Sequence, residues 1–407
     1  MQEEDSRRSR EKLYPSLFAF FSLTRMLGVF VSTWNVGGVL PDGDLRLDDW
    51  LDAGNTYDVY VLGFQEAVPL TPKNVISPER RPLSRWNSLI KAALNRSSSS
   101  SSYFSSSSSS LPPTGERQKI HPVKDGPTPS RSSSHASPEF LCVASKQMVG
   151  ILVSVWVRST LRRRLHHLSV SSVGCGVMGF MGNKGSVSVS FLLHNTSFCF
   201  VCCHLASGGK EGDERRRNCD AGKILSWTTF RRRCRPRRIL DHDQIILLGD
   251  LNYRVSLPEA AARNLARKKE WGELLQRDQL AAEVSDGGVF EGWSEGDVSF
   301  LPTYKYYRNS DDYYGCVQGR KGENKRAPAW CDRILWRGMG LRQIRYDRFE
   351  SRLSDHRPVR AVFVAEVRED PIRELPGRIP KARGQPLLSL ISSPPSDLLA
   401  PSIHKCP

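Results

Sequence analysis

The sequence predicts an α/β fold in which buried strands alternate with helices and several strands end in polar side chains. Residues 245–248 form a continuous apolar run, as expected for a strand buried on both faces, and the run stops at Gly249 and Asp250. Two earlier strand-like runs stop at Asn35 and at Glu66, and segments with helical spacing lie between such runs. We therefore expect an α/β core whose polar strand ends converge on one site.

The length and charge of the chain limit its class and its partners. Its 407 residues suffice for one large α/β domain or two smaller ones. With 59 Lys and Arg against 43 Asp and Glu, the formal net charge is +16, which predicts an anionic partner such as nucleic acid, a phospholipid surface or a polyphosphate. Ten irregularly spaced cysteines and the lack of a clear secretory signal predict reduced thiols in a cytoplasmic or nuclear protein. The apolar run at residues 13–23 is shorter than the about 20 residues that span a bilayer.

The first two predicted strands, at residues 29–34 and 58–64, carry oxygen donors at their ends. Asn35 follows the first strand, and Gln65 and Glu66 follow the second. Amide and carboxylate oxygens are ligands that Mg²⁺ prefers, and the chain has no Cys/His set with zinc spacing. A single glutamate at a strand end is usually just solvated. The prediction of a Mg²⁺ site therefore depends on oxygen donors occurring at the ends of both strands.

A serine-rich segment interrupts the predicted fold. Residues 97–110 are almost pure serine, and a Pro/Ser/Gly/charged stretch continues to 138, a composition that cannot bury enough apolar surface to order itself. We expect residues 95–138 to be a disordered insertion in one domain, because strand patterns resume at 140–157. An interdomain linker is the alternative. It would require the chain after residue 138 to carry a complete site alone, and the candidate residues Asn35 and Glu66, which precede the segment, argue against that. The predicted domain covers residues 28–368, between an N-terminal extension at 1–27 and a disordered tail at 369–407.

The middle of the chain adds two candidate site residues, Lys184 and His204. Lys184 lies in a glycine-rich loop between strands predicted at 165–177 and 185–193, where a tight turn is the commoner interpretation. His204 ends the next strand, whose Cys199 and Cys202 should face opposite ways and serve as packing. A helix is predicted at 213–230, with arginines 215–217 on a solvated face. Further helical patterns follow at 257–282.

The carboxylate at the end of the central strand has a second polar residue two positions later. If the backbone stays extended, Asp250 and Asn252 point the same way and form a clamp for a water molecule, whereas a simple Asn/Asp/Gly turn is the alternative. Later in the chain, residues 302–306 and 325–333 could hold an anion. Those stretches contribute Tyr304, Lys305, Lys325, Arg326 and Asp332, and the pair Asp355 and His356 precedes a strand at 359–367.

Eight motifs in order connect these positions: TWNVGG, GFQE, GFMGNKGSVSVS, HLASGGKEGDERRRN, LLGDLNYR, PTYKY, APAWCDRILWRG and SDHRPV. Together they resemble the inositol polyphosphate 5-phosphatases, and the serine-rich insertion resembles the plant type I enzymes most. The likeness covers residues 29–367. It implies an α/β (α+β) fold like that of deoxyribonuclease I, a four-layer sandwich of two mainly antiparallel β-sheets flanked by helices.

The resemblance also implies catalytic roles. Glu66 and Asn35 would hold Mg²⁺, with Asp355 near the metal, and Asp250 with Asn252 would position and deprotonate the attacking water. His356, paired with Asp332 as an imidazolium, and His204 would contact the phosphate that is cleaved.

Substrate choice is assigned by the resemblance to the anion-holding residues. Tyr304, Lys305 and Arg326 would bind the neighbouring 4-phosphate, with Lys184 as a helper. Where the family often has a basic residue two positions before the arginine, this chain has Asn324, and Lys325 would substitute. The implied substrates are phosphatidylinositol 4,5-bisphosphate, phosphatidylinositol 3,4,5-trisphosphate and soluble inositol 1,4,5-trisphosphate. We expect a monomer that contacts anionic membranes peripherally and binds no nucleic acid.

Two other functions remain compatible with the sequence. A nuclease of the same superfamily would explain the net charge of +16 equally well, although PTYKY and APAWCDR resemble the inositide branch. An inactive phosphoinositide-binding protein would keep the pocket without the chemistry, although every matched catalytic position is intact.

Overall fold

The computed structural model describes residues 24–55, 57–96, 139–231, 236–285, 287–316 and 326–369. Strand β1 (Thr24–Asn35) begins before residue 28, so residues 24–27 belong to the domain and not to the expected N-terminal extension. They pair with the last strand of the same sheet. Most of the predicted insertion, the tail from 370 and Lys325 lie outside the described residues.

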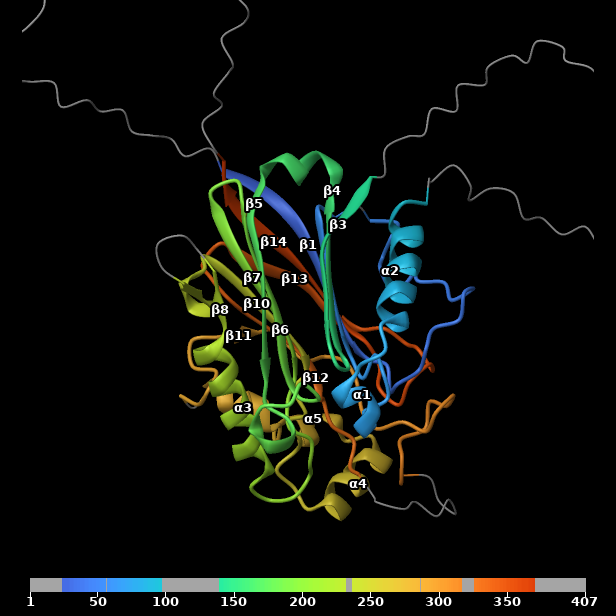
Figure 1. Ribbon diagram of the computed structural model, residues 1–407. Coiled ribbons are helices and arrows are strands. Elements are labelled where there is room, and N and C mark those ends of the chain that lie inside the picture. The colour runs from blue at the N-terminus through green and yellow to red at the C-terminus, as the bar shows by residue number, and fades with distance from the viewer. Residues whose placement is uncertain are drawn as a thin grey trace, which may run out of the picture. The chain divides into compact units, whose positions relative to one another are not determined.

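Two six-stranded sheets form the centre of the domain (Figure 1). The first sheet has the order β13-β14-β1-β2-β4-β3, and the second has the order β11-β12-β10-β7-β6-β5. Neighbouring strands are antiparallel except for one parallel pair in each sheet, β1 with β2 and β7 with β10. The strands not yet given are β2 (Val59–Gln65), β3 (Phe140–Met148), β4 (Ile151–Arg158), β5 (Leu165–Gly174), β6 (Gly185–Leu193), β7 (Thr196–His204), β10 (Gln244–Asp250), β11 (Ser294–Glu295), β12 (Asp332–Arg337), β13 (Leu341–Arg348) and β14 (Val359–Arg368).

Helices cover the outer faces of both sheets, which gives the four layers expected. Helix α2 (Arg81–Leu94) buries Trp86 and Ile90 on the first sheet, and α3 (Asp213–Trp227) buries Ala221 and Ile224 on the second (Figure 1). The shorter helices are α1 (Pro72–Ile76), α4 (Glu259–Lys268), α5 (Trp271–Leu275) and α6 (Gln279–Ser285). No helix in the described part of the chain is long and apolar enough to span a bilayer. The predicted deoxyribonuclease I-like sandwich is confirmed.

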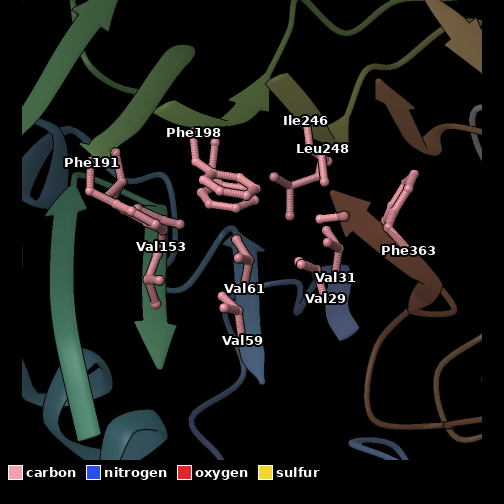
Figure 2. Packing of buried hydrophobic residues seen from close by; sticks show 14 of the residues in the cluster. Val29, Val31, Val59, Val61, Val153, Phe191, Phe198, Ile246, Leu248 and Phe363 are labelled. Atoms are coloured by element: carbon pink, nitrogen blue, oxygen red, sulfur yellow. The ribbon is translucent and has the colours of Figure 1, made fainter. Parts of the chain in front are cut away.

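The core lies between the two sheets. Figure 2 shows valines of β1 and β2, such as Val31 and Val61, facing Phe198 of β7 and Leu248 of β10. All seven residues of β10 are buried, as the continuous apolar run predicts for a central strand. Cys202 lies in this core, whereas Cys199 packs on the outer, helix-covered face, so the two thiols face opposite ways as expected.

The topology brings polar strand ends together. Strands β1 and β2 are parallel, as are β7 and β10, so the last residues of these strands lie at the same end of their sheets. Strands β14 and β12 are antiparallel to β1 and β10, so their first residues lie at that end too. In the second sheet, Asp250 is directly beside His204 on one neighbour and Asp332 on the other. The register alone therefore places three predicted site residues in one row.

Strand β13 and helix α1 are among the elements that were not predicted from the sequence. Strand β13 reads LRQIRYDR and is half exposed at the edge of its sheet, so its charged residues hide the apolar pattern. Helix α1 spans only five residues and buries none of them. The helix predicted at 213–230 ends at Trp227, because Thr229–Phe230 forms the short strand β8 with β9 (Arg237–Arg238).

Candidate active site

The first group of predicted residues meets at the ends of β1, β2 and β10. The amide nitrogen of Asn35 donates to Asp250 Oδ2 at 2.9 Å and to Glu66 Oε1 at 3.4 Å. The oxygen of the same amide accepts a hydrogen bond from the Gly37 amide at 3.0 Å. Asn35 therefore brings two carboxylates from opposite sheets to one point. Glu66 adopts a φ of 50°, a strained conformation for this residue type and one that occurs at functional sites.

Two basic groups, His204 and Lys184, lie beside these carboxylates. His204 Nε2 is 3.3 Å from Asp250 Oδ2 and 3.9 Å from Glu66 Oε1, and it also contacts Lys184 Nζ. Burial and the Lys184 charge lower the pKa of His204, so its imidazole is neutral at neutral pH. Burial also lowers the pKa of Lys184, against the attraction of Asp250 and Glu66. Lys184, in the glycine-rich loop, thus lies in contact with the polar cluster at the strand ends.

Asp250 is almost completely buried and remains ionised. Burial by itself raises the pKa of this carboxyl, but the hydrogen bond from His204 and the charges of His356 and Lys184 outweigh it and hold the pKa below its usual range. A carboxylate of this kind is a strong hydrogen-bond acceptor for a water molecule and a weak proton acceptor.

The predicted water clamp of Asp250 and Asn252 is wrong in its geometry. The chain turns after the strand, with Asn252 at a φ of 58°, and the Asn252 amide donates to Asp250 Oδ1 at 3.1 Å. The side chain of Asn252 donates to Leu205 O and accepts from Arg254, so it ties the turn to the end of β7. The extended backbone does not persist because the carboxylate and the following amide close a local turn, as Asx residues do.

His356 pairs with Asp332 as predicted. His356 Nδ1 lies 2.8 Å from Asp332 Oδ2, and Thr303 Oγ1 donates to the same oxygen at 2.7 Å. Burial lowers the pKa of His356, but the carboxylates of Asp332, Asp250 and Asp355 outweigh it and raise the pKa to about 9. The imidazolium is therefore present at neutral pH. The other oxygen of Asp332 is buried without a hydrogen-bond partner among the described residues.

Among the residues predicted to hold an anion, Tyr304 lies directly next to this pair. The Tyr304 ring packs on the His356 ring with a centroid distance of 4.4 Å. Lys305 Nζ lies 3.3 Å from Asp355 Oδ2, and burial, which raises the pKa of Asp355, is outweighed by the charges of His356 and Lys305. Arg326 lines a cavity of about 580 Å³ with Lys210 and Arg216. Lys325 lies outside the described residues.

The donor set at the end of the strands fits a hard divalent cation. Glu66 and Asp250 present carboxylate oxygens to the same Asn35 amide, and the unpartnered Asp332 oxygen adds a third acidic group on the neighbouring strand. Oxygen ligands of this kind suit Mg²⁺ or Ca²⁺. Asp250, Asp332 and His356 also place one ligand atom each within 4.8 Å of one another.

Two arginines near the site are buried, although the sequence analysis predicted one to be solvated and did not single out the other. Arg217, expected on a solvated face, is fully buried and donates to Gly208 O and Gln279 Oε1, because this side of α3 packs against the turn after β7. Arg254 was not singled out, although it ends the motif GDLNYR, which could have indicated it. It contacts both Asn252 and Tyr304.

Two packed sheets with carboxylates and histidines at one end of the strands define a phosphoesterase of the endonuclease/exonuclease/phosphatase class. Accordingly, the family model described as Endonuclease/Exonuclease/phosphatase family 2 matches residues 32–112 and 128–362.

Within that class, the chain belongs to the inositol polyphosphate 5-phosphatase family. A type IV inositol polyphosphate 5-phosphatase 9 from Arabidopsis thaliana is 52% identical over 344 residues, which cover 83% of this chain and 78% of that protein. A type I inositol polyphosphate 5-phosphatase 8 from the same plant is 49% identical over 346 residues, covering 84% and 71%. The solved inositol polyphosphate 5-phosphatase domain of SPsynaptojanin, in complex with inositol (1,4)-bisphosphate and calcium ion, matches with a TM-score of 0.66 at 28% identity, covering 85% of this chain and 86% of that one.

Proposed function

We propose that this protein removes the 5-phosphate from phosphoinositides and soluble inositol polyphosphates with Mg²⁺ as cofactor. The observation that carries the proposal is the row of Asp250, His204 and Asp332 on adjacent strands, completed by Glu66 and His356. The SPsynaptojanin domain was solved with inositol (1,4)-bisphosphate, which is what remains when the 5-phosphate leaves inositol 1,4,5-trisphosphate. That relative supports the same substrate class for this chain.

Some residues of this chain would act on the attacking water, and others would bind the phosphate. Glu66, with Asn35 and Asp250 beside it, would hold the cation, which supplies positive charge against the phosphate. Asp250 accepts a hydrogen bond from the attacking water and orients it for in-line attack. The His356 imidazolium, oriented by Asp332, donates to a phosphoryl oxygen, whereas the one N–H of the neutral His204 donates to Asp250 and helps to orient that carboxylate.

Residues around the cluster would recognise the rest of the substrate. Tyr304, Lys305 and Arg326 would bind the phosphate at ring position 4, and Lys305 would exchange its Asp355 partner for that phosphate. Substrates with and without a 4-phosphate should therefore differ in turnover.

Peripheral contact with an anionic membrane is supported by the loop between β5 and β6. Val177, Met178 and Phe180 are exposed there, next to a cavity of about 550 Å³ that Lys184, Arg216 and Lys223 also line. Apolar side chains beside cations are suited to a phospholipid surface. We accordingly propose a cytoplasmic monomer that acts at membranes.

The test is phosphate release by the purified protein with Mg²⁺. Phosphatidylinositol 4,5-bisphosphate and inositol 1,4,5-trisphosphate should turn over, phosphatidylinositol 4-phosphate should not, and Asp250→Asn should lower kcat by about a thousandfold. The exposed Asp297→Asn is the matched control and should keep full activity. Lipid binding without turnover would replace this proposal with the inactive binding protein, and cleavage of DNA would replace it with the nuclease.

A further inference from the structure

Arg254 is a buried arginine whose charge has no acidic partner. The residue is 8% exposed, and no described carboxylate lies within ion-pair distance of its guanidinium. Nε donates to Asn252 O at 3.1 Å and Nη2 to Asn252 Oδ1 at 2.7 Å, whereas Nη1 is buried without a hydrogen-bond partner among the described residues. Buried guanidinium groups are costly and are normally paired, so a specific role for this one is expected.

The same guanidinium packs on the substrate-recognition side of the site. Arg254 Cζ lies 4.5 Å from the centroid of the Tyr304 ring, and that ring packs on His356. One planar group therefore touches the turn that carries Asp250 and the tyrosine that faces the substrate. A desolvated guanidinium–tyrosine contact of this kind is attractive and helps to hold both partners in one geometry.

Arg254 also lines a small recess beside the larger cavity that Arg326 lines. It shares this recess with Arg326, Glu259 and Gly209, and these three residues also line the larger cavity that contains Lys210 and Arg216. A phosphate bound by Arg326 would thus lie next to the recess that Arg254 lines. Any shift of Tyr304 on phosphate binding would reach Asn252 through a single side chain.

We propose that Arg254 is a positioning residue that couples recognition of the phosphate next to the scissile one to the alignment of Asp250. This inference rests on the proposed function of the site. Through Arg254, part of the binding energy of the neighbouring phosphate is used to align the catalytic turn, so that this phosphate raises kcat as well as lowering KM. Lysine cannot replace it, because an ammonium lacks the planar fork that grips Asn252 at two points and stacks on Tyr304.

The experiment compares two soluble substrates that share the scissile phosphate, inositol 1,4,5-trisphosphate and inositol 1,5-bisphosphate. For the wild-type chain, the trisphosphate should have the higher kcat. In Arg254→Lys, kcat for the trisphosphate should fall by about tenfold to a hundredfold, and the kcat ratio of the two substrates should approach one, while the 4-phosphate still lowers KM.

Arg217→Lys is the matched control. Arg217 is also fully buried and packs on a tyrosine, with Cζ 5.4 Å from the Tyr253 centroid, but no hydrogen bond joins it to Asn252 and no ring contact joins it to Tyr304. The same substitution there should leave the kcat ratio at its wild-type value.

A second pair of variants tests the coupling without altering Arg254. Tyr304→Phe keeps the ring and loses the hydroxyl, so it should raise KM for the trisphosphate and keep the kcat ratio. Tyr304→Leu removes the ring between Arg254 and the substrate and should collapse the kcat ratio, with no further loss in the double variant with Arg254→Lys.

Two results would overturn the inference while the proposed function stands. One is a wild-type kcat that is equal for both substrates, and the other is an Arg254→Lys variant that keeps the wild-type ratio. If the wild-type chain released phosphate from neither substrate, the proposed function itself would fail and the inference with it.

Discussion

At the residue scale, the site depends on two carboxylate–imidazole contacts of opposite character. His204 is neutral because burial and Lys184 lower its pKa, whereas His356 is charged because Asp332 and other carboxylates raise its pKa to about 9. The two histidines lie on opposite sides of Asp250, whose pKa they and Lys184 keep low despite its burial. A phosphate in this site would meet one cationic donor, His356, beside a neutral imidazole that hydrogen-bonds Asp250.

The charge of His356 predicts an alkaline limit to activity. Because its pKa is raised, the imidazolium is fully present at neutral pH and is lost as the pH rises through about 9, so kcat should decline there. Asp332→Asn removes the main attraction and leaves burial, which should move the decline to lower pH. The pH–rate profile of both proteins and an NMR titration of His356 measure this. An alkaline decline at the same pH in both proteins would contradict it.

The carboxylate of Glu66 predicts a specific loss of cation affinity. A chelator should abolish activity, and Glu66→Gln should raise the Mg²⁺ concentration for half-maximal activity by about tenfold or more. The Mg²⁺-dependent rise of Tm should shift in parallel, which separates binding from chemistry. The exposed Glu79→Gln serves as control, and equal Mg²⁺ dependence in the two variants would argue against Glu66 as a ligand.

At the element scale, strand β10 is the centre of the site, and a glycine lets it lie close to β7. Gly249 has a φ of 155°, and a Cβ there would lie 2.1 Å from the backbone oxygen of Cys203 on β7. Any side chain would separate this parallel pair just before Asp250 and His204.

Gly249→Ala should therefore lower both stability and activity. We expect a loss of about 2 kcal/mol or more in the free energy of unfolding, and a lower kcat because Asp250 and His204 separate. The control is Gly272→Ala in helix α5, where an added Cβ has no heavy atom within 4 Å and stability should change by less than about 1 kcal/mol. Denaturant unfolding measures both variants, and similar stabilities would refute the steric argument.

The strands and most helices were predictable from the sequence because their apolar periods are local properties. The edge strand β13 was not, because its alternating arginines and half-buried side chains hide the period. At the site, Asn35, Glu66, His204 and Asp250 could be predicted as strand-end polar residues. At Asn252 the sequence left a turn and an extended water clamp as alternatives, and the structure shows the turn, which contacts Leu205 and Arg254.

At the scale of the whole molecule, a net charge of +16 accompanies an exposed apolar loop close to the substrate-binding side. Met178 is 81% exposed and Phe180 65% exposed in that loop. Charge attracts the protein to an anionic surface over about a Debye length, and apolar side chains then add contact area.

Activity on vesicles should therefore depend on salt and on this loop. Raising the salt concentration should lower turnover of phosphatidylinositol 4,5-bisphosphate in anionic vesicles more than turnover of soluble inositol 1,4,5-trisphosphate. The double variant Met178→Ser, Phe180→Ser should show the same selective loss. Met339→Ser, also fully exposed but in the turn between β12 and β13 away from the site, is the control. Equal effects on both substrates would contradict membrane contact by the loop.

The sequence by itself determined the class of fold, the polar strand ends and the family motifs, because all three are written in local composition and spacing. Only the tertiary structure decided that the chain turns at Asn252, that Lys305 is held by Asp355, and that Arg217 and Arg254 are buried. These features depend on which distant segments pack together. Strand register and burial convert local patterns into contacts, and a single segment contains no information about its partners.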